Sequence, residues 1–204
     1  MKNTSRRIRL IWAAVLGVVL ICISVAAAIS VVEAGTSLLP GEKENIVMPL
    51  IIMSTSFTRD GEIPARYTCD SVNISPPLTW TGVPAGTKSL ALIVDDPDAP
   101  NPEAPKMTWV HWVLYNIPPD ASGLPESIAA EGLPRGALQG LNDWQRTGYK
   151  GPCPPIGKHR YFFKLYALDT LLPDMKHPAK AALEKAMQGH ILVQSELIGL
   201  YQRQ

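Results

Sequence analysis

A glycine- and proline-rich stretch at residues 151–157, followed by an apolar run at 161–168, constrains the fold more than any other part of the chain. Its three prolines fix φ and lack a backbone donor, while glycines at both ends permit turns and close approaches. The apolar run is short enough to predict a core strand. We therefore expect a stiff loop that delivers His159, Arg160 and Tyr161 to the mouth of a buried strand. Such a loop suits the wall of an anion site; the alternative is a proline-stiffened turn with a surface histidine.

The rest of the chain predicts a mainly β domain with few helices. Strands are expected at residues 50–57, 89–95, 109–118 and 190–201, and an extended segment at 73–80 carries prolines that suggest a sheet edge. The run at 89–95 is continuously apolar, which is typical of a strand buried on both faces. One helix is expected at 178–188, closed by Gly189. Residues 119–150 show no period, and an irregular segment of that length is usually functional or mobile.

An uncharged apolar segment precedes this domain. Residues 10–32 carry no charge, four basic residues lie before them, and Glu33 follows. A run of this length predicts a membrane-spanning helix with the N-terminus in the cytoplasm and the domain on the outer side, periplasmic or extracellular. The alternative is a signal peptide cleaved near Ala34, which would release the domain to the periplasm. The expected organisation is therefore an anchor or signal at 1–34, a linker at 35–48 and one domain at 49–204.

The charge and cysteine content narrow the function of that domain. The whole chain has a formal charge of +1, and the basic leader accounts for more than this, so the exported part is slightly acidic. This composition argues against nucleic acid as a partner. The exported part has two cysteines, Cys69 and Cys153. They either pair in an oxidising compartment or remain free thiols, and the sequence does not distinguish these.

Several ordered motifs carry a family resemblance. They are Asp-Pro-Asp-Ala-Pro at 96–100, His-Trp at 111–112, and Gly-Pro-Cys-Pro-Pro-x-Gly-x-His-Arg-Tyr at 151–161, with Tyr-Thr-Cys-Asp at 67–70, Ser-Pro-Pro-Leu at 75–78 and Gly-His-Ile-Leu at 189–192. Together they resemble the phosphatidylethanolamine-binding protein (PEBP) family, in particular its bacterial YbhB/YbcL-like, or Raf kinase inhibitor-like, branch. The resemblance spans nearly the whole exported domain.

This resemblance implies a fold and a site. The fold would be a large antiparallel sheet packed on a smaller sheet, with a C-terminal helix. The site would be a small pocket at the sheet ends for phosphate or phosphoryl head groups, lined by Asp96, His111, His159 and Tyr161, with the backbone of Gly151 and Pro152 as its floor. We expect Asp96 to orient one histidine while both histidines and Tyr161 donate to the anion. No cofactor or metal is expected, and bacterial relatives suggest a homodimer.

Three alternatives stay open for this constellation. An aspartate, two histidines and a tyrosine also suit acid–base chemistry, so the domain could be a small-molecule hydrolase, although no nucleophile elbow or phosphate loop is present. Two histidines and a carboxylate could hold a divalent metal ion, without local ligand spacing to support it. The third alternative is an inhibitor of a protease or kinase that acts by surface contact. We expect a non-catalytic binding protein.

Overall fold

The computed structural model describes residues 48–204, which form nine strands, one α-helix and two 3-10 turns. The elements follow the order β1 (Ile51–Met53), β2 (Gly61–Glu62), η1 (Ala65–Tyr67), β3 (Leu78–Thr81), β4 (Ser89–Asp96), β5 (Trp109–Ile117), β6 (Gly123–Leu124), η2 (Ala130–Gly132), β7 (Leu138–Gln139), β8 (His159–Leu168), α1 (Lys180–Met187) and β9 (Ile191–Tyr201). The predicted leader and most of the linker lie outside the described residues. Their boundaries stay predictions.

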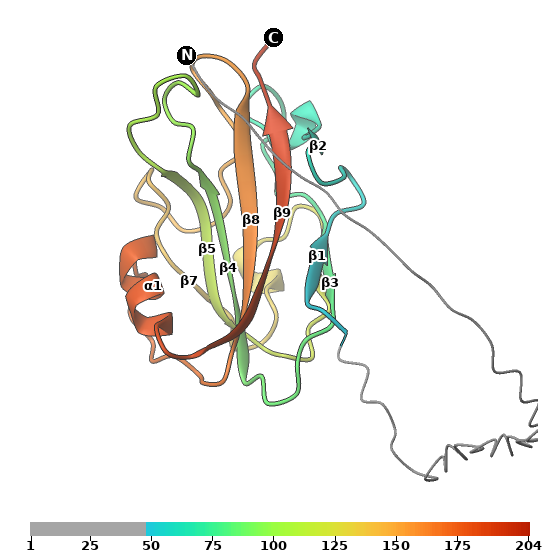
Figure 1. Cartoon of the computed structure of the whole chain (residues 1–204), viewed down its shortest axis with the longest axis vertical. Helices are drawn as coiled ribbons and strands as arrows, with labels where there is room; N and C mark the ends of the chain where they lie inside the picture. The colour runs from blue at the N-terminus through green and yellow to red at the C-terminus, as the bar shows by residue number, and fades with distance from the viewer. Residues whose placement is uncertain (1–47) are drawn as a thin grey trace, which may run out of the picture. The chain divides into compact units, whose positions relative to one another are not determined.

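The strands form two sheets. The large sheet has the order β2-β9-β8-β4-β5-β7 and is antiparallel except for the short parallel pair of β2 with β9. The small sheet has the order β1-β3-β6 and is antiparallel. Helix α1 lies on one side of the large sheet, and β1 and β3 lie on the other (Figure 1). The predicted arrangement of a large sheet packed on a small one is therefore confirmed.

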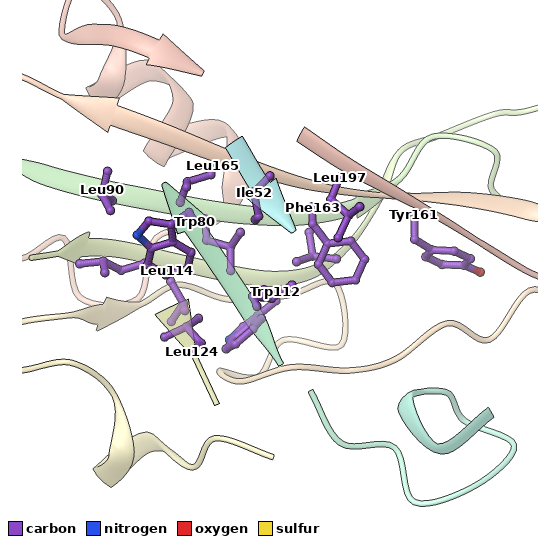
Figure 2. Close-up of a cluster of buried hydrophobic side chains, with 14 of the residues drawn as sticks. Ile52, Trp80, Leu90, Trp112, Leu114, Leu124, Tyr161, Phe163, Leu165 and Leu197 are labelled. Carbon is purple, nitrogen blue, oxygen red and sulfur yellow. The ribbon is translucent and has the colours of Figure 1, made fainter. Parts of the chain in front are cut away.

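Both faces of the large sheet are buried. Along β4, Leu90, Leu92 and Val94 belong to the core between the two sheets, whereas Ala91 and Ile93 belong to a second core beneath α1. Because successive side chains of a strand alternate between faces, a strand covered on both sides reads as one continuous apolar run. The larger core extends along the sheets to Tyr161, which lies at one end of it (Figure 2).

Polar residues gather at the edge of the large sheet where Tyr161 lies. His159, the first residue of β8, pairs with Tyr201 at the end of β9, and Asp95 and Asp96 end β4 beside it. Three antiparallel strands thus bring residues far apart in the sequence to one edge. The Ala99–Pro100 peptide bond in the turn after β4 is cis.

Two sequence predictions about strands need correction. The segment around 73–80 was expected at an edge, but β3 lies between β1 and β6, because its prolines precede the strand and leave the ladder of Leu78–Thr81 intact. The first strand is also shorter than the predicted 50–57. The helix and the strands at 89–96, 109–117 and 191–201 lie where they were expected, and Gly189 ends the helical segment with a φ of +80°.

The structure resolves the two alternatives for the cysteines. Cys69 and Cys153 form a disulfide that joins the turn after η1 to the proline-rich loop. The backbone N–H of Cys69 also donates to the carbonyl of Pro152, at 3.0 Å. Between residues 48 and 204, no helix is long and apolar enough to cross a membrane.

Candidate functional site

A cavity of about 440 Å³ opens at the end of the large sheet where β4 and β5 meet the start of β8. Its size lies within the range of small-molecule pockets. It brings together segments near residues 96–100, 107–111, 144 and 153–161. The lining consists of Asp96, Ala99, Pro100, Met107, Trp109, His111, Trp144, Cys153, Pro154, Pro155, His159 and Tyr161.

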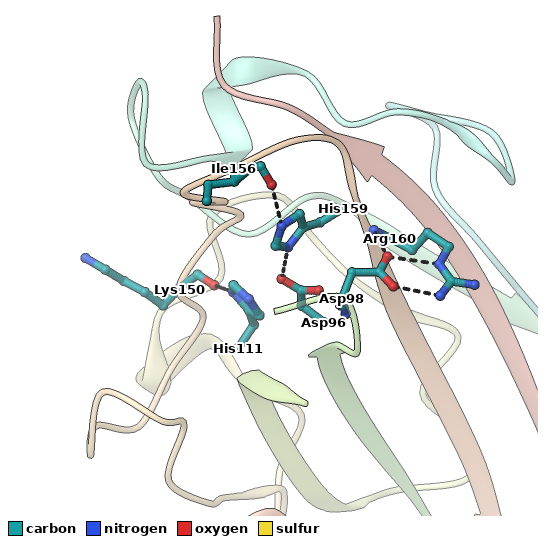
Figure 3. Close-up of polar contacts among 7 residues, drawn as sticks. All are labelled: Asp96, Asp98, His111, Lys150, Ile156, His159 and Arg160. Atoms are coloured by element: carbon teal, nitrogen blue, oxygen red, sulfur yellow. Dashed lines mark hydrogen bonds and ion pairs between the residues drawn. The ribbon is translucent and has the colours of Figure 1, made fainter. Parts of the chain in front are cut away.

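His159 and Asp96 form a buried pair at the base of this cavity. Nδ1 of His159 lies 2.7 Å from Oδ2 of Asp96, and Nε2 lies 2.9 Å from the carbonyl oxygen of Ile156 (Figure 3). Burial, the largest influence, raises the pKa of Asp96 above its usual value even though the hydrogen bond with His159 opposes that shift. The hydrogen bond between Nδ1 and Oδ2 joins the two side chains, and both side chains are almost fully buried.

This geometry decides which histidine Asp96 orients. The sequence left open whether the partner would be His111 or His159, and the structure assigns His159. Both ring nitrogens of His159 face acceptors of the protein itself, so no N–H of this ring remains for a ligand. The expectation that His159 donates to an anion does not fit this arrangement. Its geometry suits a positioning role, in which it ties the loop at Ile156 to the end of β4.

His111 enters the cavity because β5 contains a bulge. Val94 of β4 pairs with Trp112 and Asp95 pairs with Val110, which leaves His111 as the extra residue. A bulge interrupts the alternation of side chains and turns the extra residue toward a site that a regular strand would not reach. Its Nδ1 donates to the carbonyl oxygen of Lys150 at 2.6 Å. His111 is buried between its tryptophan neighbours in the strand, with 2% of its surface exposed.

The charge state of His111 follows from that burial. Desolvation lowers its pKa from 6.5 to about 4, despite the hydrogen bond to Lys150 that favours the charged form. His111 is therefore neutral at physiological pH, with its proton on Nδ1. Nδ1 is the nitrogen that contacts Lys150, and the backbone of Gly151 also favours the charged form, by less than Lys150 does. Nε2 consequently presents a lone pair, which accepts a proton rather than donating one.

Tyr161 supplies the donor of the cavity. Its side chain is 1% exposed, and the hydroxyl has no hydrogen-bond partner among the residues that the structure describes. The ring stands edge to face with His111, with centroids 5.2 Å apart. Burial raises the pKa of Tyr161 above its usual value, so the hydroxyl keeps its proton. A buried O–H without a partner is unfavourable, and a ligand oxygen in the cavity would satisfy it.

Two nearby cations are already paired. Arg160 donates from its backbone N–H and from its guanidinium to Asp98, with distances between 2.7 and 2.9 Å. The hydrogen bond from Arg160 is the largest influence that lowers the pKa of Asp98, which remains ionised. Lys158 pairs with Glu62 at 3.0 Å. Neither basic side chain is among the lining residues of the cavity.

The predicted site residues divide into two groups. Asp96, His111, His159 and Tyr161 all line the cavity, from three different strands. Gly151 and Pro152 do not line it. The N–H of Gly151 donates to Oδ1 of Asn73 at 2.8 Å, and a proline has no N–H to offer. They fasten the loop to the segment around Asn73 and Cys69, and their place as the floor of an anion site stays a prediction.

Sequence reasoning missed the aromatic wall. Trp109 and Trp144 lie edge to face with centroids 5.4 Å apart, and Trp144 also meets the ring of His111 at 5.2 Å. Trp109 lies two residues before His111 in the sequence, a position that could have indicated the same rim. Trp144 belongs to the irregular segment, which offered no period from which to place it.

The geometry of residues 48–204 bears on the metal alternative. Within the described part of the chain, no group of three or more His, Cys, Asp or Glu side chains is arranged to hold a metal ion. Nδ1 of His159 bonds to the carboxylate of Asp96, and Nε2 bonds to the carbonyl oxygen of Ile156, so neither nitrogen is free to bind a metal ion. The donor set of this site therefore does not fit the metal alternative.

The two-sheet architecture and the cavity at its strand ends define a small-ligand-binding domain of the PEBP type. The family model described as phosphatidylethanolamine-binding protein matches residues 53–202. The chain belongs to this family.

Relatives support the assignment. A UPF0098 protein of Methanothermobacter thermautotrophicus is 56% identical over 72% of this chain and 95% of its own length. The crystal structure of a PEBP homologue from Chlamydia trachomatis, CT736, matches with a TM-score of 0.69 and 43% identity over 76% of this chain and 99% of that one. E. coli YbcL, described as a member of the mammalian PEBP family, matches with the same TM-score and 32% identity over 77% and 100% of the two chains.

Proposed function

We propose that this protein binds phosphate or a phosphoryl head group in the cavity at the end of the large sheet. The observation that carries the proposal is the buried hydroxyl of Tyr161, which has no partner among the described residues and lies beside the neutral ring of His111. At about 440 Å³ the cavity has room for more than inorganic phosphate, so a head group such as phosphoethanolamine also fits.

The binding chemistry follows from the protonation states. Tyr161 donates to a phosphoryl oxygen, and Nε2 of neutral His111 accepts from a protonated one. His159 and Asp96 hold the wall in place through their mutual hydrogen bond. The cavity therefore favours the monoprotonated form of a phosphate monoester, whose second pKa is about 6. Affinity is expected to fall as the pH rises above that value.

The test is a calorimetric titration of the full-length protein with phosphate and with phosphoethanolamine, repeated for Tyr161→Phe. A hydrogen bond to a charged group contributes about 1.5–3 kcal/mol, so the loss of the hydroxyl should weaken binding about 10- to 100-fold. Tyr166→Phe is the matched control, because Tyr166 lies on the same strand but belongs to the core beneath α1. Equal affinities of the two variants would refute the assignment.

We propose binding rather than catalysis for this site. The hydrolase alternative rests on the aspartate, the two histidines and the tyrosine of the cavity, with Cys153 beside His159 as a candidate nucleophile and base. Cys153 is held in a disulfide and His159 uses both nitrogens within the protein, so neither is available for attack or proton transfer. A screen with phosphomonoesters and acyl esters checks this, since turnover that Tyr161→Phe or His111→Gln abolishes would favour an enzyme.

We also propose that the domain acts outside the cytoplasm. Two independent features support this: the uncharged segment at residues 10–32, and the disulfide between Cys69 and Cys153, a bond typical of oxidising compartments. Protease treatment of intact cells or spheroplasts tests it. A domain degraded only after lysis of the cytoplasmic membrane would contradict the proposal, and extraction with alkaline carbonate separates an anchored form from a cleaved one.

A further inference from the structure

A second cavity, of about 380 Å³, lies on the same strand β5 but shares no lining residue with the first. Its walls come from the segment at 73–75, from Trp112 in β5, and from two stretches of the irregular segment, 127–133 and 147–149. This irregular segment was singled out by its length and lack of period, and the anion site accounts for only Trp144 within it. The irregular segment therefore contributes mainly to the walls of this second cavity.

The walls of the second cavity are held by specific hydrogen bonds. Ser75 accepts from Ser127 N–H with its carbonyl at 2.9 Å and from Ile128 N–H with its hydroxyl at 3.1 Å. Across the cavity, the hydroxyl of Tyr149 donates to the carbonyl of Tyr67 at 2.9 Å, which fixes the position of that ring. Ligand pockets are usually largely pre-formed, and these bonds give this cavity a defined shape without a ligand.

The lining has a distinctive chemistry. None of the described residues that line it is an Asp, Glu, Lys, Arg or His. Five carry neutral groups that donate, accept or do both: Asn73, Ser75, Ser127, Gln139 and Thr147.

Two aromatic rings complete the lining. Trp112 and Tyr149 stand edge to face with centroids 5.7 Å apart. Trp112 is 1% exposed, and its indole N–H has no hydrogen-bond partner among the described residues.

This lining discriminates between classes of ligand. A charged ligand would lose water without meeting a compensating charge, which is costly. Asn73 and Ser75 already bond to the protein, but a purely apolar ligand would leave the side-chain groups of Ser127, Gln139 and Thr147 and the indole N–H of Trp112 without partners in the cavity. A small ring with apolar C–H faces and hydroxyls around its edge satisfies both parts of the wall, since aromatic side chains combine a large apolar surface with a polar donor.

We propose that the second cavity is a binding site for a neutral, polyhydroxylated small molecule of monosaccharide size, with the indole N–H of Trp112 donating to one of its hydroxyl oxygens. Thr147 lies on the exposed rim of the cavity and supplies a second hydroxyl contact. The site is independent of the anion cavity, so both ligands bind at once.

The experiment follows the tryptophan indole N–H signals of the full-length, 15N-labelled protein by NMR during titration with glucose, galactose, mannose and N-acetylglucosamine. At least one sugar should shift the Trp112 signal in a saturable manner. Trp80 is the internal control, because its indole N–H already donates to the carbonyl of Ala121 at 2.6 Å and should stay in place. Phosphate should instead shift Trp109 and Trp144, which line the first cavity.

Two variants sharpen the test. Thr147→Val removes one exposed hydroxyl with little change in volume and should weaken sugar binding by about 3- to 10-fold. Trp112→Phe removes the N–H and should weaken it by about 10-fold. The proposal is overturned if no sugar shifts the Trp112 signal, if phosphate shifts it as the sugars do, or if Thr147→Val binds the sugar unchanged. Because Thr147→Val leaves the core intact, the test stands even if Trp112→Phe does not fold.

Discussion

The burial of His111 predicts a stability that falls steeply with acidification. In the folded protein its pKa is lowered from 6.5 to about 4 by desolvation, whereas in the unfolded chain it returns to 6.5. Between these two values the unfolded state binds one more proton than the folded state. The free energy of unfolding therefore rises with pH across this window. The contribution is fully present above pH 6.5 and is lost as the pH falls to about 4.

The magnitude follows from the width of the window. Each pH unit between the two pKa values changes stability by about 1.4 kcal/mol, so the whole shift corresponds to on the order of 3 kcal/mol. The perturbation that isolates it is His111→Gln. Glutamine does not titrate, and its side-chain amide can still donate to the carbonyl of Lys150 that accepts from His111 at 2.6 Å.

The assay is urea unfolding of the native protein and of His111→Gln at several pH values between 7.5 and 4. Contributions from the other histidines and from the carboxylates largely cancel in the difference between the two free energies of unfolding. As the pH falls, the free energy of unfolding of the native protein should decrease relative to that of His111→Gln by on the order of 3 kcal/mol. A constant difference would refute the reasoning, as would an NMR titration of the His111 ring with a midpoint near 6.5.

Four further perturbations test the fold. Replacing both Cys69 and Cys153 by serine opens a loop with a sequence separation of 84. The loss of the loop constraint on the unfolded chain should lower the free energy of unfolding by about 4.5 kcal/mol. An equal midpoint of denaturation for the oxidised protein and the variant would contradict this. Asp95→Ala leaves the lysines at 164 and 180 without their buried partner and should cost about 3 kcal/mol in urea unfolding, whereas a surface-like loss below about 0.5 kcal/mol would show that the network is unimportant. Phe163→Ala in the core between the sheets should cost about 3–5 kcal/mol, and Gly199→Ala, whose new methyl would lie 2.5 Å from a side-chain carbon of Ile63, should lower the thermal midpoint rather than raise it.

The local pattern of the sequence determined most of the elements and the membership of the site. Continuous apolar runs predicted the strands buried on both faces, because period and composition reflect how many faces a strand buries. The alanine-rich stretch closed by Gly189 predicted α1. The family resemblance of the motifs around Asp96, His111 and His159 predicted side chains that share one cavity. The antiparallel pairing brings the end of β4 and the starts of β5 and β8 to one edge of the sheet.

Only the tertiary structure decided how those residues are used. The bulge that turns His111 into the cavity depends on the register between β4 and β5, which a single strand does not encode. The partner of Asp96, the pairing of Cys69 with Cys153 and the second cavity beside Trp112 each depend on distances between segments far apart in the sequence. Burial also sets the charge of His111 and leaves the hydroxyl of Tyr161 without a partner among the described residues. Sequence patterns report the local propensity of each segment, whereas these properties arise from its neighbours in space.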